Sequence, residues 1–229
     1  MINVLASWDD LGQSILALQK DHHFHSDPLK NWDLAHIGRL LAGVPRTARI
    51  LDAGCSASEC SLLRYLDRKG FREMVGIDLR VGFNDRIHQL MLMKDRRTLK
   101  PPFKLVEGDI IRTPFESESF DGILSLSVIE HEVDLEKFLR ESHRLLRPNG
   151  LLYFSTDYWP EKIDTEGLRH WGLRWNIFCR DEIDSLVEAA MRIGFGIEDR
   201  TIPPAKDPIV KWSGKEYTFL SVALKKMAG

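Results

Sequence analysis

Short apolar runs recur along the chain and alternate with longer stretches that have a helical pattern. Several of the runs end in glycine or in an acidic residue, which is typical of a strand that leads into a turn. Their length and aliphatic content favour buried strands. The pattern predicts strands over residues 49–54, 73–78, 103–109, 120–127 and 150–156.

Three of the intervening stretches have the signals of amphipathic helices, over residues 56–70, 134–150 and 181–194. The first begins with Ser56 and Glu59 in capping-box spacing. The third has Asp181 as its expected N-cap and Gly194 as its stop. Strands that alternate with helices of this length predict crossover connections and a mostly parallel sheet.

The two ends of the chain depart from this alternation. Residues 195–199 and 217–226 are both strand-like, and a loop containing Pro and Lys separates them, which predicts an antiparallel hairpin. Residues 8–20 and 29–42 are predicted helices. We therefore expect a doubly wound α/β fold with a mostly parallel seven-stranded sheet. Residues 1–46 would form an N-terminal helical extension and residues 47–229 the main domain.

Composition narrows the class of protein. The chain of 229 residues is 43% hydrophobic with a formal net charge of -2, so it can form a core but has no excess charge for binding nucleic acid or an anionic membrane. No apolar run approaches the roughly 20 residues of a membrane helix. The first residues lack a secretory pattern, and three cysteines are too few for a disulfide framework. We expect a cytoplasmic protein.

Acidic residues stand at the ends of three predicted strands, at Asp52, Asp78 and the Glu107–Asp109 segment. Ligands of open α/β sheets bind outside the carboxyl ends of the strands, where a carboxylate can accept hydrogen bonds from a ribose diol. A single aspartate could simply begin a turn. Acidic residues at three strand ends favour a ligand site.

The turn after the first predicted strand, residues 52–59, contains one glycine. It therefore lacks the G-x-G-x-x-G fingerprint of dinucleotide-binding folds, and it has no G-K-[ST] sequence of a P-loop. The first absence counts against a nicotinamide oxidoreductase, and the second counts against a P-loop.

This turn resembles motif I of the class I S-adenosylmethionine-dependent methyltransferases, an acid-x-Gly-x-Gly-x-Gly sequence. Asp52 and Gly54 match it, whereas Ser56 and Ser58 stand at the later glycines. Four further segments are similar to this family in the order of the family, between residues 49 and 156. They are Val-Gly-Ile-Asp78, Glu-Gly-Asp109-Ile110, residues 120–131, and Leu146-Arg-Pro-Asn-Gly150.

The resemblance implies that the chain binds S-adenosylmethionine and releases S-adenosylhomocysteine. It implies that Asp78 binds the ribose and that Asp109 and Ile110 bind the adenine. Asp52 would order the loop or reach the amino group of the methionine part. The other implied cofactor contacts are Gly54, Cys55, Ser56, Leu79 and Ser125, with Gly54, Cys55 and Ser125 acting through backbone groups.

The two serines leave an alternative open. A serine can cap the following helix, but it also adds a Cβ where the backbone of the family lies close to the methionine part of the cofactor. We favour retained cofactor binding and an enzyme. The alternative is a non-catalytic binding or scaffold protein that keeps the fold.

A hydroxyl acceptor needs a base, and His131 is the first candidate because it follows the fourth predicted strand. The alternative is that Glu130 and His131 merely begin a helix. His170 is the second candidate.

Substrate selection is expected in residues 155–180, which directly follow the fifth predicted strand and contain Tyr158, Trp159, Trp171 and Trp175. These side chains would form an aromatic lid that excludes water from a ring-shaped or sugar-like acceptor. An aromatic mini-core beneath a long loop is the equally weighted alternative.

No metal site is expected. His22, His23 and His25 are adjacent and lack a cysteine or carboxylate at ligand spacing, so we interpret them as a solvated helix end. The predicted activity is methyl transfer to an oxygen or nitrogen of a small-molecule acceptor. We expect no nucleic-acid or membrane partner, and a monomer or a homodimer.

Overall fold

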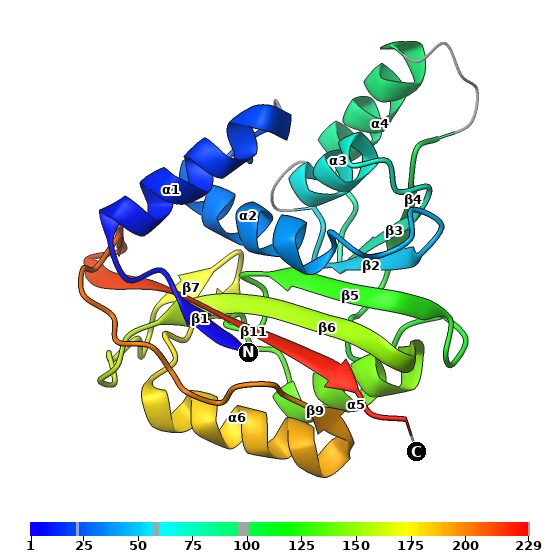
Figure 1. Cartoon of the computed structure of the whole chain (residues 1–229). Helices are drawn as coiled ribbons and strands as arrows, with labels where there is room; N and C mark the ends of the chain where they lie inside the picture. The colour runs from blue at the N-terminus through cyan, green and yellow to red at the C-terminus, as the bar shows by residue number, and fades with distance from the viewer. Residues whose placement is uncertain (22, 57–59, 96–100, 229) are drawn as a thin grey trace.

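A central sheet separates two groups of helices in the computed structural model (Figure 1). The structure describes residues 1–21, 23–56, 60–95 and 101–228. The strands of the continuous sheet follow the order β1-β11-β6-β5-β2-β3-β4. Their bounds are Ile2–Val4 (β1), Lys215–Lys226 (β11), Leu146–Tyr158 (β6), Phe120–Leu126 (β5), Arg49–Ala53 (β2), Glu73–Asp78 (β3) and Lys104–Glu107 (β4).

The five central strands are parallel, as predicted. β2 pairs with both β3 and β5, while β4 and β6 extend the sheet on either side. β5 and β6 change register near the Arg-Pro-Asn-Gly segment, so residues 147–150 bulge at the start of β6. The doubly wound, mostly parallel α/β fold is confirmed.

The antiparallel part of the sheet is built around β11. This strand pairs with β6, with the short β9 (Phe195–Gly196) and with β10 (Val210–Trp212), so the predicted C-terminal antiparallel pairing is present. β1, which the sequence pattern does not predict, pairs with residues 220–222 of β11. The segment 1–46 therefore contributes a strand to the main sheet as well as helices.

The helices cover both faces of the sheet (Figure 1). α2 and α3 pack with the sheet in one apolar cluster, and α1 packs against α2. α5 and α6 pack against the opposite face in a second cluster. The bounds are Trp8–Leu18 (α1), Asn31–Leu40 (α2), Ser61–Arg68 (α3), Phe83–Asp95 (α4), Leu135–Leu145 (α5) and Arg180–Ile193 (α6).

Two predicted helix starts are wrong. α3 begins at Ser61 rather than at residue 56, because Cys60 at its N-cap has a left-handed φ of 56°. Glu59, the proposed partner in the capping box, lies outside the described residues. α6 begins after Cys179, whose backbone N–H donates to the Glu182 carboxylate, so Asp181 lies in the first turn rather than at the cap.

The sequence pattern does not predict α4, yet this helix supplies one of the residues that shape the site. None of the helices described in the structure has the length and apolar content required to cross a bilayer.

Candidate functional site

The carboxyl ends of β2, β3 and β4 bring the predicted acids to one edge of the sheet. Ala53 pairs with Ile77, so Asp52 and Asp78 lie on neighbouring strands near their ends. Asp78 pairs in turn with Glu107 of β4. Asp52 is buried, whereas Asp78 is half-buried and reachable from solvent. The topology thus forms a row of carboxyl groups of graded exposure.

The Asp52 carboxyl is poorly suited to carry a charge in the absence of a ligand. Burial, and secondly the nearby Asp78, raise its pKa to about 8. A cation bound at this edge would favour the ionised form.

We expect this raised pKa to appear as a pH-dependent loss of stability. Between the unfolded pKa of about 4 and the folded value near 8, the folded state holds a proton that the unfolded state has released. The stability contributed below that range is therefore lost as the pH rises, by about 1.4 kcal/mol per pH unit. Asp52→Asn removes this group. Urea unfolding across that range should show the wild type losing stability relative to the variant, and parallel profiles would contradict the assignment.

The loop after β2 is held over the end of β3 by backbone hydrogen bonds. The Gly54 and Cys55 N–H groups donate to the Ile77 carbonyl at 2.8 and 3.3 Å. The Ser56 N–H donates to Asp78 Oδ2 at 3.0 Å. Asp78 therefore helps to order the loop as well as lying at the edge of the predicted ribose site.

Asp85 fastens the same loop from α4. Its buried carboxylate accepts hydrogen bonds from the Gly82 N–H at 2.8 Å, the Ser56 hydroxyl at 2.8 Å and the Cys60 thiol at 3.6 Å. The side chain of Ser56 is thus directed to Asp85. Ser58 lies outside the described residues. The sequence pattern does not predict Asp85 as a site residue, because it does not predict α4.

The other predicted cofactor residues lie around this edge. Asp109 Oδ1 accepts from the Ile111 N–H at 3.0 Å, Ile110 is almost completely buried, and Leu79 is exposed. The Ser125 hydroxyl is buried and donates to the Ala53 carbonyl at 2.8 Å, so its side chain ties β5 to β2.

A cavity of about 240 Å³ opens beside Asp52 and Gly54. Three distant parts of the chain form most of its walls: the segment 25–30, the end of β5 with the following turn, and the segment 210–219. The lining residues are His25, Ser26, Asp27, Leu29, Lys30, Asp52, Gly54, Leu62, Leu126, Ser127, Glu130, His131, Asp157, Trp171, Val210, Trp212, Tyr217 and Phe219.

Two of the carboxyl groups of this cavity are buried in its wall. Glu130 accepts a hydrogen bond from the Thr156 hydroxyl at 3.1 Å, and Asp157 accepts one from Trp175 Nε1 at 2.7 Å. Burial raises the pKa of Glu130 to about 8, with a further contribution from Asp157. Burial likewise raises the pKa of Asp157 to about 6, against an opposing effect of Lys30.

His131, the first candidate base, borders the cavity. Burial lowers its pKa to about 4, and His170 and Lys30 act in the same direction, so the imidazole is neutral at neutral pH. His170 lies outside the cavity lining. Its ring is 4.2 Å from the Trp212 ring and 4.7 Å from the Trp175 ring, centroid to centroid.

The aromatic residues of 155–180 occupy several environments. Trp171 lines the cavity from the turn of a small hairpin, formed by β7 (Arg169–His170) and β8 (Leu173–Arg174). Tyr158 is fully buried in the core that includes α6 residues. Trp159 and Trp175 belong to a third apolar cluster. Both a cavity wall and an aromatic core are therefore present, and Trp212 is a wall residue that was not predicted.

Glu132 connects this hairpin to the turn that carries His131. Its carboxylate accepts from the Arg174 backbone N–H at 3.0 Å and from Arg174 Nε at 2.9 Å. Arg169 lies 3.9 Å away. These contacts orient Trp171 toward the His131 ring, at a centroid distance of 4.8 Å.

The interpretation of the N-terminal histidines as solvated is wrong for two of them. His23 and His25 are buried, because the segment that carries them folds against α3 and the cavity. His23 Nε2 lies 3.1 Å from the Ser61 carbonyl, and His25 Nδ1 accepts from the Asp27 N–H at 3.0 Å. His22 lies outside the described residues.

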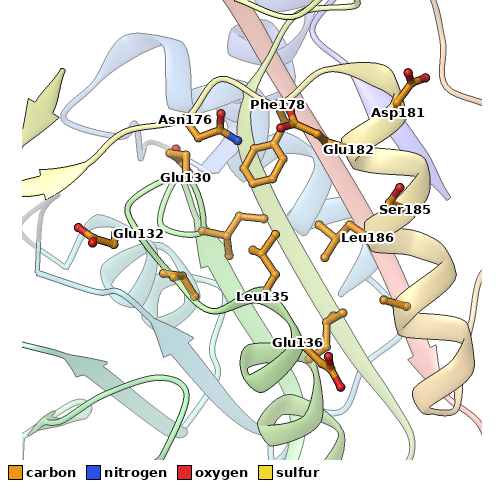
Figure 2. Close-up of a pocket in the computed structure, with 14 residues that line it drawn as sticks. Glu130, Glu132, Leu135, Glu136, Asn176, Phe178, Asp181, Glu182, Ser185 and Leu186 are labelled. Carbon is orange, nitrogen blue, oxygen red and sulfur yellow. The ribbon is translucent and has the colours of Figure 1, made fainter. Parts of the chain in front are cut away.

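A larger hollow of about 540 Å³ lies between α5 and α6 (Figure 2). Apolar side chains such as Leu135, Phe178 and Leu186 form its floor, and acidic side chains such as Glu136 and Asp181 stand around it. Of the described lining residues, Glu130 alone borders both hollows. None of the acids at the ends of β2, β3 and β4 borders the larger one, so the smaller cavity is the candidate site.

Comparison with known proteins identifies similar sequences and folds. A family described as a methyltransferase domain matches residues 51–154, which run from within β2 through β5 and most of β6. A sterol 24-C-methyltransferase of Pneumocystis carinii is 26% identical over 205 residues, which cover 84% of this chain and 50% of that protein. The chain thus spans about half the length of this curated relative.

Solved structures show the same fold. The [4+2]-cyclase SpnF superposes with a TM-score of 0.60 at 16% identity, covering 96% of this chain and 94% of that chain. The 1,6-didemethyltoxoflavin-N1-methyltransferase of Burkholderia thailandensis, solved with bound 1,6-didemethyltoxoflavin and S-adenosylhomocysteine, gives a TM-score of 0.59 at 19% identity. It covers 98% of this chain and 92% of that chain.

Proposed function

Because the chain belongs to the class I S-adenosylmethionine-dependent methyltransferase family, we propose that it transfers a methyl group from S-adenosylmethionine to a small molecule. The cofactor would lie along the carboxyl ends of β2, β3 and β4. The acceptor would occupy the cavity of about 240 Å³. The observation that carries this proposal is that Asp52 and Gly54, at the cofactor edge, also line the cavity.

The residues at this edge fit the cofactor chemically. S-adenosylmethionine carries an ammonium group, a sulfonium group and ribose hydroxyls, which are cations or hydrogen-bond donors. The carboxyl groups of Asp52 and Asp78 are matching acceptors. Gly54 adds no Cβ where the turn passes Val128. We assign the ribose to Asp78, the adenine to Asp109 and Ile110, and the remaining contacts to Cys55, Ser56, Leu79 and Ser125.

The bound cofactor supplies a methyl group that is already activated by its positive sulfur. The protein has to align the acceptor, exclude water and receive a proton. We assign His131 as the candidate base, because its neutral imidazole borders the cavity, and keep His170 as the second candidate. Trp171 would limit the access of water from the hairpin side.

We propose an oxygen or nitrogen of the acceptor as the methylated atom, in a compound with an aromatic or sugar-like ring. The aromatic walls and the small cavity support a flat or compact ligand. The related proteins include a C-methyltransferase and an N-methyltransferase, so family membership leaves the atom open.

The first test is the melting temperature of wild type and Asp78→Ala with S-adenosylhomocysteine. Ligand at about 100 times its dissociation constant should stabilise the wild type by about 2.7 kcal/mol, or roughly 5–10 °C. Asp78→Ala removes a carboxylate that accepts hydrogen bonds and should weaken binding by about 10–100-fold. The matched control is Asp164→Ala on the exposed surface, which should retain the full shift.

The competing proposal is a scaffold that keeps the fold without the cofactor. The absence of a shift in cooperatively melting wild type would favour it and reject the enzyme. The [4+2]-cyclase with this fold motivates a further check. Binding of S-adenosylmethionine without formation of S-adenosylhomocysteine from any acceptor in a broad panel would separate cofactor binding from methyl transfer.

A further inference from the structure

Lys30 places an ammonium group in the wall of the cavity. Its side chain is 9% exposed, and Nζ lies 3.2 Å from the centre of the Phe219 ring. Nζ donates to the Ser127 hydroxyl, which is its one hydrogen bond in the part of the chain that the structure describes. An ammonium group has three donors. Donors of Lys30 are therefore available to a ligand in the cavity.

Carboxyl groups surround Lys30, and Asp33 forms an ion pair with it. Asp33 of α2 is completely buried and lies 3.8 Å from Nζ. Glu130 and Asp157 lie close enough for the positive charge of Lys30 to lower their pKa values, although burial raises both pKa values overall. The charged and titratable groups around Lys30 are Asp27, Asp33, Glu130, Asp157, His25 and His131.

Asp27 is exposed at the cavity, whereas Asp33, Glu130 and Asp157 are less exposed than the ammonium-bearing side chain of Lys30. Glu130 and Asp157 are 1% and 3% exposed and already accept hydrogen bonds from Thr156 and Trp175. A ligand in the cavity would therefore contact the ammonium group of Lys30, which is paired with Asp33, and the neutral imidazole of His131. This surface is complementary to a negatively charged oxygen.

We infer that Lys30 binds the reacting oxygen of the acceptor as an oxyanion, so that the acceptor is a ring compound with an acidic hydroxyl of the phenol or enol type. This inference rests on the proposed function and specifies its substrate class. Trp171 and Trp212 provide aromatic surfaces for the ring.

The properties of His131 support an acidic hydroxyl over an ordinary alcohol. A group whose pKa is held near 4 is a weak base and would remove the proton of an aliphatic alcohol inefficiently. A nearby ammonium group lowers the pKa of a phenol, because it stabilises the charged form. Lys30 would thus make the hydroxyl acidic enough for the weakly basic His131 to accept its proton.

The proposed step balances without another reactant. The O–H bond of the acceptor breaks, and its proton passes to the imidazole of His131 and then to water. The oxyanion, held by Lys30, forms the new bond to the methyl carbon. The carbon–sulfur bond breaks at the same time and leaves its electron pair on sulfur. The products are a methyl ether and S-adenosylhomocysteine.

4-Nitrophenol tests the inference directly because its phenolate has a distinct visible absorption. The probe is titrated with pH in the presence of excess wild type and S-adenosylhomocysteine. We expect the pKa of bound 4-nitrophenol to be lower than that of the free compound by about 1–3 units. 4-Nitroanisole, which has no ionisable hydroxyl, is the control for binding of the ring, measured by tryptophan fluorescence.

The variants separate the charge of Lys30 from its structural role. Lys30→Met/Asp33→Asn removes the ammonium group together with a buried counterion, so no new unpaired charge arises at Asp33. It should abolish the pKa shift of 4-nitrophenol and leave the binding of 4-nitroanisole within about twofold. Asp33→Asn alone keeps Lys30 and should keep the shift.

Three results would overturn the inference: an unshifted pKa of bound 4-nitrophenol, a shift retained in the double variant, or no binding of 4-nitrophenol to protein that S-adenosylhomocysteine stabilises. Failure of S-adenosylhomocysteine to stabilise the wild type contradicts the proposed function instead. In this case the pH titration of 4-nitrophenol with wild-type protein alone still tests whether Lys30 stabilises a bound oxyanion.

Discussion

Gly54→Ala should destabilise the protein by about 2–5 kcal/mol and weaken the binding of S-adenosylhomocysteine. Gly54 has a φ of 94°, which an alanine adopts only with strain. An added Cβ would also lie 2.2 Å from Val128 Cγ2, well inside van der Waals contact. The loop after β2 must therefore shift. Urea unfolding and calorimetric titration with S-adenosylhomocysteine would measure both effects.

The double variant Gly54→Ala/Val128→Ala separates the two causes. Truncating Val128 removes the atoms in conflict with the new Cβ but leaves the backbone strain. We therefore expect the double variant to be more stable than the sum of the single changes predicts, with a residual cost of about 1–2 kcal/mol from φ. Strict additivity would show that the loop relaxes away from Val128 and that the contact does not define the turn.

Asp85→Ala should cost about 3 kcal/mol and reduce the affinity for S-adenosylhomocysteine by about tenfold. The variant leaves the Gly82 N–H, the Ser56 hydroxyl and the Cys60 thiol without their shared acceptor. Because Ser56 also contacts Asp78, loss of this anchor loosens the loop at the proposed ribose site. Urea unfolding gives the stability, and calorimetric titration gives the affinity.

Two controls determine whether the Asp85 carboxylate acts through the loop. Ser56→Ala removes one of its hydrogen bonds and should cost about 1 kcal/mol. Asp85→Asn keeps one acceptor oxygen and should fall between the wild type and Asp85→Ala. If the Asp85→Ala variant is destabilised but binds S-adenosylhomocysteine with unchanged affinity, Asp85 stabilises the fold and does not order the ligand site.

The parallel core of the fold was predictable because each of its strands carries a local signal. β2, β3 and β5 are short apolar runs that end near acidic or small residues, and the sequence alone located them. The positions of Asp52 and Asp78 at the ends of these strands predict that both lie at one edge of the sheet. The register of β2 and β3 brings the two residues to neighbouring strands.

The start of α3 and the edge strand β1 were not predictable in the same way. β1 has three residues, too few for an alternating pattern, and exists because it pairs with β11 at the other end of the chain. α3 begins at Ser61 rather than at residue 56 because Cys60 has a left-handed backbone conformation. This conformation is uncommon for residues other than glycine, so the sequence does not predict it.

The acceptor cavity was the least predictable part of the site. The aromatic segment 155–180 suggested its chemistry, but of the four residues named there Trp171 alone lines the described cavity. Lys30 and Trp212 come from distant segments without a recognisable motif. Only the paired strands β6 and β11 and the fold of residues 25–30 bring them together.

The separation in sequence between the segments that form the cavity has a consequence for the order in which parts of the protein fold. β2 to β5 lie within residues 49–126, whereas the cavity needs residues 25–30 and 210–219 together. Contacts between residues far apart in sequence carry a larger loop-closure cost and form late. We expect the cofactor edge to acquire hydrogen-exchange protection during refolding before the cavity does. The intermediate would be able to hold the methyl donor before it could select an acceptor.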